Sequence, residues 1–163
     1  MTVSTRPRAS KAPAPTDHES LRLWLRLFTC TTQIERSVGS ALKREFKSSL
    51  PRFDLLAQLG RAPHGLRMGE LSERILTTGG NVTWLVRALE TDGLVTRRVS
   101  PVDKRAAVVR LTPAGRRQFA VMARAHERWI ISMFSSLAPT DRRTMHALLG
   151  RVKEQFRPSR TPE

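Results

Sequence analysis

The chain has 163 residues, and its 29 Lys and Arg against 14 Asp and Glu give a formal net charge of +15 at pH 7. The single cysteine excludes a disulfide within the chain, and no apolar run reaches the roughly 18 residues of a membrane span, so we expect a cytoplasmic protein without membrane contact. There is no glycine-rich phosphate loop, no zinc-type Cys/His pairing and no marked nucleophile, so we expect no enzyme, metal site or cofactor. A positive excess this large is typical of a nucleic-acid binder, although an anionic membrane or metabolite would also suit it.

The N-terminal third predicts a basic tail and two helices. Residues 1–16 are rich in Pro, Ala, Lys and Arg and are expected to be disordered. Thr16 and Glu19 fit a capping box, and the apolar residues that follow, as far as Phe46, recur at helical spacing on more than one side. We therefore expect a second subunit to cover this helix. Another helix is predicted to begin near Pro51 and to end before the break at residues 60–65.

A pair of helices follows, and the second has the features of a DNA-reading element. The spacing predicts a helix over 68–76, a turn in which Thr78 caps the next helix, and that helix over 81–91. Its apolar positions at i, i+3, i+4 and i+7 form a buried face: Val82, Leu85, Val86 and Leu89. The opposite face offers an amide, a hydroxyl, an indole and a guanidinium to a major groove, on Asn81, Thr83, Trp84 and Arg87. An ordinary solvated face is the alternative for any one of these residues.

Alternating residues over 94–99 and 106–111 predict a β-hairpin with a charged turn over 100–105. An Arg extended from such a turn can enter a narrow minor groove, and a carboxylate two residues away, on Asp103, would hold Arg105 in place. Thr112-Pro113 then starts a long helix, and Pro139 starts the last one. The expected fold is mainly α with a small β-hairpin wing.

Several segments together resemble the MarR family of winged helix-turn-helix regulators. They are Leu71-Ser72-Glu73, residues 89–98, Asp103-Lys104-Arg105 and residues 109–115; the family's wing pattern, Asp-x-Arg followed by Leu-Thr-x-x-Gly, is met in full. The resemblance covers roughly 17–156. It implies dimerisation helices at 17–48 and 113–156, a DNA-binding lobe at 49–112 and a C-terminal tail at 157–163.

The resemblance also implies a homodimer that binds a pseudopalindrome in double-stranded DNA, with recognition helices about 34 Å apart. At Trp84 the sequence departs from relatives, which more often have a small or basic residue there. The residues expected to contact DNA are Thr78, Asn81, Thr83, Trp84, Arg87, Arg97, Arg98, Asp103, Lys104 and Arg105.

The resemblance further implies a repressor that a small aromatic anion releases from DNA. The expected lining of the effector site is Trp24, Arg26, Phe28, Arg52, Phe53, His126 and Trp129; each aromatic could instead be a core residue. Residues 22–27, 50–59 and 79–83 look like a branch that regulates aromatic-acid breakdown, in which aryl-coenzyme A thioesters are effectors.

Two alternatives remain open at the level of the sequence. Cys30 could make the protein a redox sensor, although a thiol in an apolar helix is more often inert packing. A protein that coats DNA without sequence preference would share the charge and the wing. An enzyme acting on an anionic metabolite is less well supported, because no general base or nucleophile can be assigned.

Overall fold

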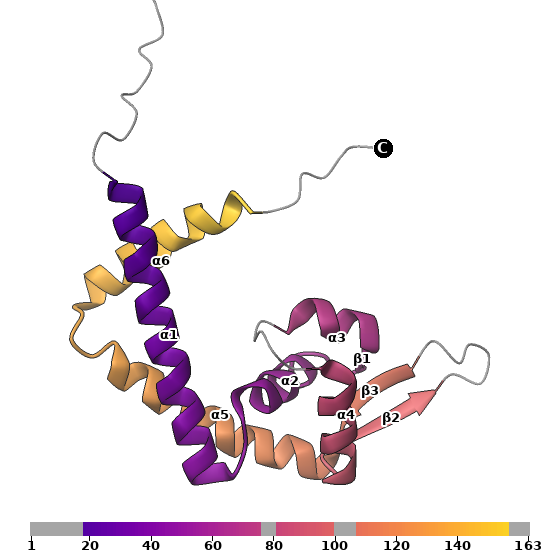
Figure 1. Cartoon of the computed structure of the whole chain (residues 1–163). Helices are drawn as coiled ribbons and strands as arrows, with labels where there is room; N and C mark the ends of the chain where they lie inside the picture. The colour runs from indigo at the N-terminus through magenta and orange to yellow at the C-terminus, as the bar shows by residue number, and fades with distance from the viewer. Residues whose placement is uncertain (1–17, 76–80, 100–106, 157–163) are drawn as a thin grey trace, which may run out of the picture. The chain divides into compact units, whose positions relative to one another are not determined.

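The computed structural model describes residues 18–75, 81–99 and 107–156 (Figure 1). The chain divides into two compact units, Met1–Ser37 and Val38–Glu163. In the first unit the described residues belong to helix α1, Glu19–Phe46, which continues into the second unit. The predicted capping residue Thr16 lies outside the described residues. The large apolar side chains of this first part of α1 are exposed: Leu21, Leu23, Trp24, Leu25 and Phe28.

The second unit begins with the end of α1, where Val38, Ala41 and Leu42 are buried. Helix α2, Leu50–Gly60, follows after Lys47, which has a positive φ of 51°. Ser49 caps α2 by accepting the N–H of Arg52, and Pro51 lies in the first turn, where its missing N–H costs no helical hydrogen bond. Phe53, Leu55, Leu56 and Leu59 of α2 are all buried and form the middle of the core.

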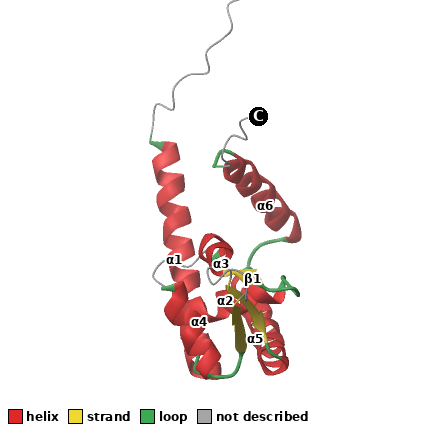
Figure 2. Ribbon diagram, turned by 90° about the vertical axis from the view of Figure 1, so that its right-hand side faces the viewer, coloured by secondary structure: helices red, strands yellow, loops and turns green. Residues whose placement is uncertain are grey.

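A three-stranded antiparallel sheet packs one of its faces against the helices of this unit. Its strands are β1, Leu66–Arg67, β2, Val95–Val99, and β3, Ala107–Leu111, in the order β1-β3-β2. In Figure 2 the strands are drawn in yellow; α4 contacts β2, and α2 and α5 contact β3. The prediction of a mainly helical fold with a small wing is confirmed. The sequence analysis missed β1, because two residues are too few to show an alternating pattern.

Helices α3, Met68–Arg74, and α4, Val82–Thr91, follow β1 along the chain. Leu71 of α3 is buried, as are Leu85, Val86 and Leu89 of α4. This confirms three of the four residues of the buried face predicted for α4, whereas the fourth, Val82, is only partly buried. The predicted cap was wrong: Asn81 caps α4, and the earlier candidate Thr78 lies outside the described residues. Thr and Asn side chains both accept a backbone N–H well at a helix start, so residue type alone did not decide between Thr78 and Asn81.

Two further helices complete the unit: α5, Pro113–Met133, and α6, Pro139–Glu154. Thr112 caps α5 by accepting the N–H of Gly115 at 2.9 Å, and its hydroxyl donates to the carbonyl of Gly93 at 2.7 Å. This residue therefore joins the start of α5 to the end of the α4–β2 connection. Met122 and Ala125 of α5 are buried, whereas α6 has no buried residue within the chain.

Candidate nucleic-acid interface

Helix α4 presents the four side chains that the sequence analysis assigned to a major groove. Asn81, Thr83, Trp84 and Arg87 are all exposed, and Trp84 exposes 63% of its surface. The buried face directly opposite fixes the helix to the lobe, so the orientation of these groups follows from the packing of Leu85, Val86 and Leu89. An exposed indole beside an exposed guanidinium is an arrangement that can contact base edges and apolar groups together.

Asn81 has a second task in the structure. Its Oδ1 accepts the backbone N–H of Trp84 at 3.2 Å and so caps the helix. Among the described residues neither N–H of its amide has an acceptor, so both can donate to an acceptor outside the helix. Asn81 is therefore both a helix cap and a candidate contact to DNA.

The C-terminal end of α4 is tied to its surroundings by two carboxylates. Arg52 of α2 forms a salt bridge with Asp92, the C-cap residue of α4. Glu90 accepts the backbone N–H of Arg97 at 3.3 Å, which links α4 to β2. A carboxylate at a helix C-terminus is repelled by the helix dipole, and Arg52 compensates that repulsion at Asp92.

Of the predicted wing residues, Arg97 and Arg98 lie on β2 and are exposed. The predicted tip residues Asp103, Lys104 and Arg105 lie outside the described residues, as does Thr78. The sequence analysis missed two other exposed arginines of this sheet, Arg67 on β1 and Arg110 on β3. No signal in the sequence groups them with Arg98, because their proximity depends on the pairing of β1 with β3.

The residues proposed to line an effector site fall into two groups, one in each unit. In the second unit, the ring centroids of Phe53 and His126 are 4.8 Å apart, those of Phe53 and Phe119 are 5.9 Å apart, and Trp129 lies beside Phe46 at 6.2 Å. Burial lowers the pKa of His126 from its usual value of 6.5. The neutral form of the His126 imidazole is therefore favoured where it packs beside the ring of Phe53.

Arg52 lies next to this cluster in the sequence and is already engaged. Its Nη2 donates to Asp92, whereas its Nε is buried without an acceptor among the described residues. An effector carboxylate that reached Arg52 would compete with Asp92 for one donor and satisfy another.

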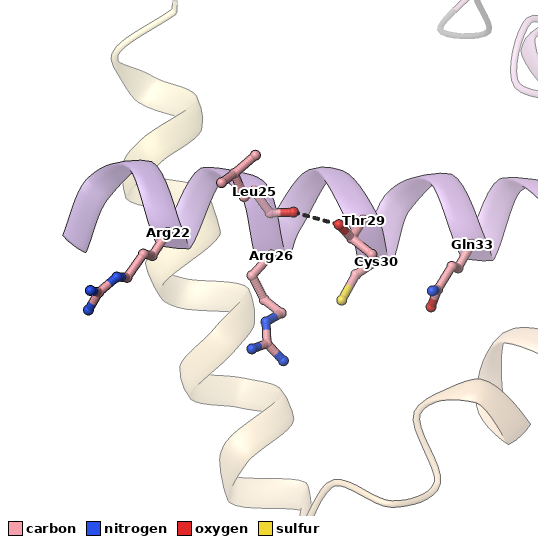
Figure 3. A pocket seen from close by; sticks show the side chains of 6 residues that line it. All are labelled: Arg22, Leu25, Arg26, Thr29, Cys30 and Gln33. Atoms are coloured by element: carbon pink, nitrogen blue, oxygen red, sulfur yellow. Dashed lines mark hydrogen bonds between the residues drawn. The ribbon is translucent and has the colours of Figure 1, made fainter. Parts of the chain in front are cut away.

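In the first unit, Trp24 and Phe28 stack on each other with ring centroids 5.8 Å apart. Arg26 lines a separate pocket along α1 with Arg22, Leu25, Thr29, Cys30 and Gln33 (Figure 3). Cys30 is exposed within the chain; the sequence had left open whether its thiol acts as a redox sensor or packs among apolar residues.

Within the described ranges, no cluster of three His, Cys, Asp or Glu residues could hold a metal ion. The same ranges contain no helix that is both long and apolar enough to cross a membrane.

The relatives described here are transcriptional regulators. A model of the MarR family matches residues 49–106. The chain is 30% identical over 108 residues to YdgJ, an uncharacterised HTH-type transcriptional regulator of Bacillus subtilis, and the match covers 66% of this chain and 65% of that protein. It therefore spans just under two thirds of that relative. It is also 28% identical over 134 residues to the transcriptional activatory protein BadR of Rhodopseudomonas palustris, covering 78% of this chain and 75% of BadR.

Solved structures agree with the sequence relatives. A MarR family transcriptional regulator from Silicibacter pomeroyi superposes with a TM-score of 0.76 and 30% identity, covering 89% of this chain and 100% of that one. Sco3205, a MarR family regulator from Streptomyces coelicolor solved in complex with DNA, gives a TM-score of 0.77 and 25% identity, with 92% and 95% of the two chains covered.

Proposed function

Because this chain belongs to the MarR family of transcriptional regulators, we propose that it binds a pseudopalindromic operator in double-stranded DNA as a homodimer and represses transcription until a small aromatic anion or aryl-coenzyme A thioester binds. The observation that carries the proposal is the exposed face of α4. Thr83, Trp84 and Arg87 stand there on a helix whose opposite face is buried. The related Sco3205 was solved in complex with DNA, which supports assigning the same partner to this chain.

Sequence preference is what separates this proposal from a protein that coats DNA without selection. Fluorescence anisotropy would compare DNA from upstream of this protein's own gene with a scrambled duplex at about 150 mM salt, since affinities depend strongly on salt. We expect a preference of about a hundredfold or more. If the two duplexes bind equally, selection from a random pool decides the matter, and a pool that shows no enrichment contradicts the proposal.

Homodimerisation is supported by apolar side chains that are exposed in the part of the chain that the structure describes. α6 exposes Leu148, Leu149 and Val152, Phe156 is exposed just after the helix, and the first part of α1 exposes five further large apolar side chains. Exposed apolar side chains that gather on one element of a folded chain mark interaction surfaces. A second copy of the chain is the proposed cover.

The effector proposal rests on the buried chemistry around Arg52. Its Nε lacks an acceptor in the described part of the chain, and Phe53, the next residue, lies against His126. In an aromatic acid, the carboxylate could accept the hydrogen bond from Nε of Arg52, and the ring could pack against Phe53 and His126. Isothermal calorimetry with free aromatic acids and with aryl-coenzyme A thioesters would identify the class. If neither class of compound binds saturably and neither changes the affinity for DNA, the effector proposal is rejected.

The direction of regulation is tested separately. Repression is the proposal, whereas the relative BadR is named a transcriptional activatory protein. A reporter driven by the upstream region should be more active in a deletion strain than in the complemented strain. Lower activity in the deletion strain would make this chain an activator.

The exposure of Cys30 favours one rival trigger, oxidation of the thiol. Peroxide would then weaken the DNA affinity of the wild type and leave Cys30→Ser unaffected. Equal affinities before and after peroxide treatment would eliminate this trigger.

A further inference from the structure

Three exposed arginines, one from each strand, lie on the outer face of the three-stranded sheet. In the observed register Arg67 of β1 pairs with Val108 of β3, and Val108 pairs with Arg98 of β2. Directly paired residues of an antiparallel sheet point to the same side, and so does the residue two positions along a strand. Arg110 of β3 therefore joins the same face. We call Arg67, Arg98 and Arg110 the outer-face arginines.

The opposite face of the sheet packs on the core, and Leu66, Val95, Val109 and Leu111 are buried there. Arg97, which pairs with Val109, lies on that side and is exposed. All three outer-face arginines are exposed as well. The charged groups are thus fixed to a sheet whose position is set by the packing beneath it. The backbone positions of the three arginines are therefore fixed relative to one another by the pairing of the strands.

Gly65 helps to place Arg110. A Cβ at Gly65 would lie 2.5 Å from Cγ of Arg110 and 2.7 Å from Cγ1 of Val108. The aliphatic stem of Arg110 therefore passes over Gly65, and its charged group continues toward solvent. The φ of +84° at Gly65 is also a conformation that favours glycine.

No carboxylate of the strands themselves neutralises this face. The described residues of β1, β2 and β3 include no Asp or Glu. The carboxylates recorded next to the sheet are bonded to its backbone: Glu70 accepts the N–H of Arg67 at 2.7 Å, and Glu90 accepts that of Arg97. Arg110 lies on the strand between those of Arg67 and Arg98, so its positive charge is repelled by both. This repulsion destabilises the free protein, and a bound anion would relieve it.

The spacing suits a polyanion with closely repeated charges. Arg67 and Arg98 are separated by two strand spacings, about 10 Å, and Arg110 lies diagonally from each at about 7–8 Å. One strand of DNA carries a phosphate for about every 3.4 Å of helix axis, so about three phosphates fall within such a span.

We propose that the outer-face arginines bind the phosphate backbone of the same duplex that α4 reads, and so extend the footprint of each subunit beyond its half-site. This inference rests on the proposed function. Arg67 directly precedes α3, which leads to α4, and Arg98 lies one residue before the described end of β2, the strand that leads into the predicted wing tip. The surface thus joins the two elements proposed to face DNA. Phosphate contacts carry no sequence information, so the surface adds affinity without selectivity.

The test removes the two arginines that the sequence analysis had not assigned to DNA. Arg67→Gln with Arg110→Gln should reduce the magnitude of the slope of log K against log salt by about 1.8 per bound subunit. The affinity loss should be equal for operator and scrambled DNA. Adding Arg98→Gln should lower the slope by about one more. Arg142→Gln with Arg143→Gln on α6 is the matched control, because it removes the same charge from exposed residues away from the sheet.

Melting temperatures of the wild type and the variants show whether a substitution changes folding instead of DNA binding. Relief of the repulsion should leave the melting temperature of the sheet variant unchanged or higher. An unchanged salt slope, or an equal loss of slope in the control, would overturn the inference. A loss confined to operator DNA would also overturn it. Failure of the proposed function has a different signature, which is a wild type without sequence preference.

Hydroxyl-radical footprinting checks that the contacted duplex is the same one. Wild type should protect backbone positions outside the half-sites, and the Arg67→Gln, Arg110→Gln variant should lose only those. A complex that contains two duplexes per dimer would contradict the placement on a single duplex.

Discussion

Trp84 exposes 63% of its surface on the face of α4 that also carries Arg87, three residues further along. Three residues span about 4.5 Å of helix axis, which is close to one base-pair step. An apolar ring at this position can meet the methyl group of a thymine, while the guanidinium bonds the guanine of a neighbouring pair.

Removal of that methyl group tests the role of Trp84. Replacing the contacted thymine by deoxyuridine should weaken binding of the wild type about fourfold, as expected for one buried methyl group. Trp84→Ala should bind both duplexes equally, and Trp84→Phe should retain most of the difference. The readout is competition anisotropy with operators substituted one thymine at a time. A variant Trp84→Ala that discriminates as well as the wild type would show that the indole does not read the base.

Asn81 combines capping with a candidate contact, and two substitutions separate these roles. Asn81→Ala removes the acceptor for the N–H of Trp84 and should lower the free energy of unfolding by about 1 kcal/mol. Asn81→Asp keeps the acceptor and should preserve stability, but its charge repels phosphates and should weaken DNA binding. Urea denaturation and anisotropy measure the two effects. If Asn81→Asp binds DNA normally, Asn81 is a cap alone.

At the scale of elements, the salt bridge between Arg52 and Asp92 holds the start of α2 to the end of α4. The pair is partly exposed, so we expect a coupling of only about 0.5–1 kcal/mol. Arg52→Gln should destabilise more than Asp92→Asn, because it leaves a carboxylate at the negative end of a helix dipole. A double-mutant cycle in urea measures the coupling. Additive effects of the two substitutions would mean that the bridge does not support α4.

His126 connects α5 to Phe53 of α2, and its lowered pKa makes this contact sensitive to pH. In the unfolded chain the imidazole titrates near 6.5, so below that pH the unfolded state binds more protons than the folded state. Stability attributable to His126 is therefore complete above pH 6.5, declines as the pH falls below it, and levels off below the folded pKa. Comparing melting temperatures of wild type and His126→Gln between about pH 7.5 and 5 tests this. If the melting temperatures of the wild type and of His126→Gln change with pH in parallel, His126 is not the source of this pH dependence.

The elements also show where sequence reasoning succeeds. The apolar spacing of Leu85, Val86 and Leu89 predicted the buried face of α4, since helical geometry alone decides which positions share a side. The strands β2 and β3 were predicted within a residue of their observed ends.

The failures have physical reasons as well. β1 is too short to show a period, and Arg67 and Arg110 become neighbours only through its pairing with β3. The cap of α4 was assigned to the wrong residue because two residues of suitable chemistry precede the helix. For Cys30 the sequence left two roles open, because the spacing of apolar residues along its helix does not decide the exposure of that one position, which the structure shows to be exposed.

For the whole molecule, the distribution of apolar surface matters more than any single contact. The second unit buries a continuous core, from Leu42 through Leu55, Leu56 and Leu89 to Met122. α6 contributes nothing to this core, although Leu148, Leu149 and Val152 give it an apolar face. A helix of this composition gains stability mainly from packing, so we expect its partner to be another copy of the chain.

A charge on that face should therefore separate the copies. Leu148→Glu is expected to shift a dimer toward monomer in sedimentation velocity, because a buried carboxylate without a partner is strongly unfavourable. Ala147→Glu is the matched control, since Ala147 is an exposed residue one position away along the same helix. The monomer should lose the advantage of binding two half-sites at once, so its affinity for a full operator should fall toward that for a single half-site. A dimer that withstands Leu148→Glu, or one that Ala147→Glu disrupts equally, would place the subunit contact away from the apolar face of α6.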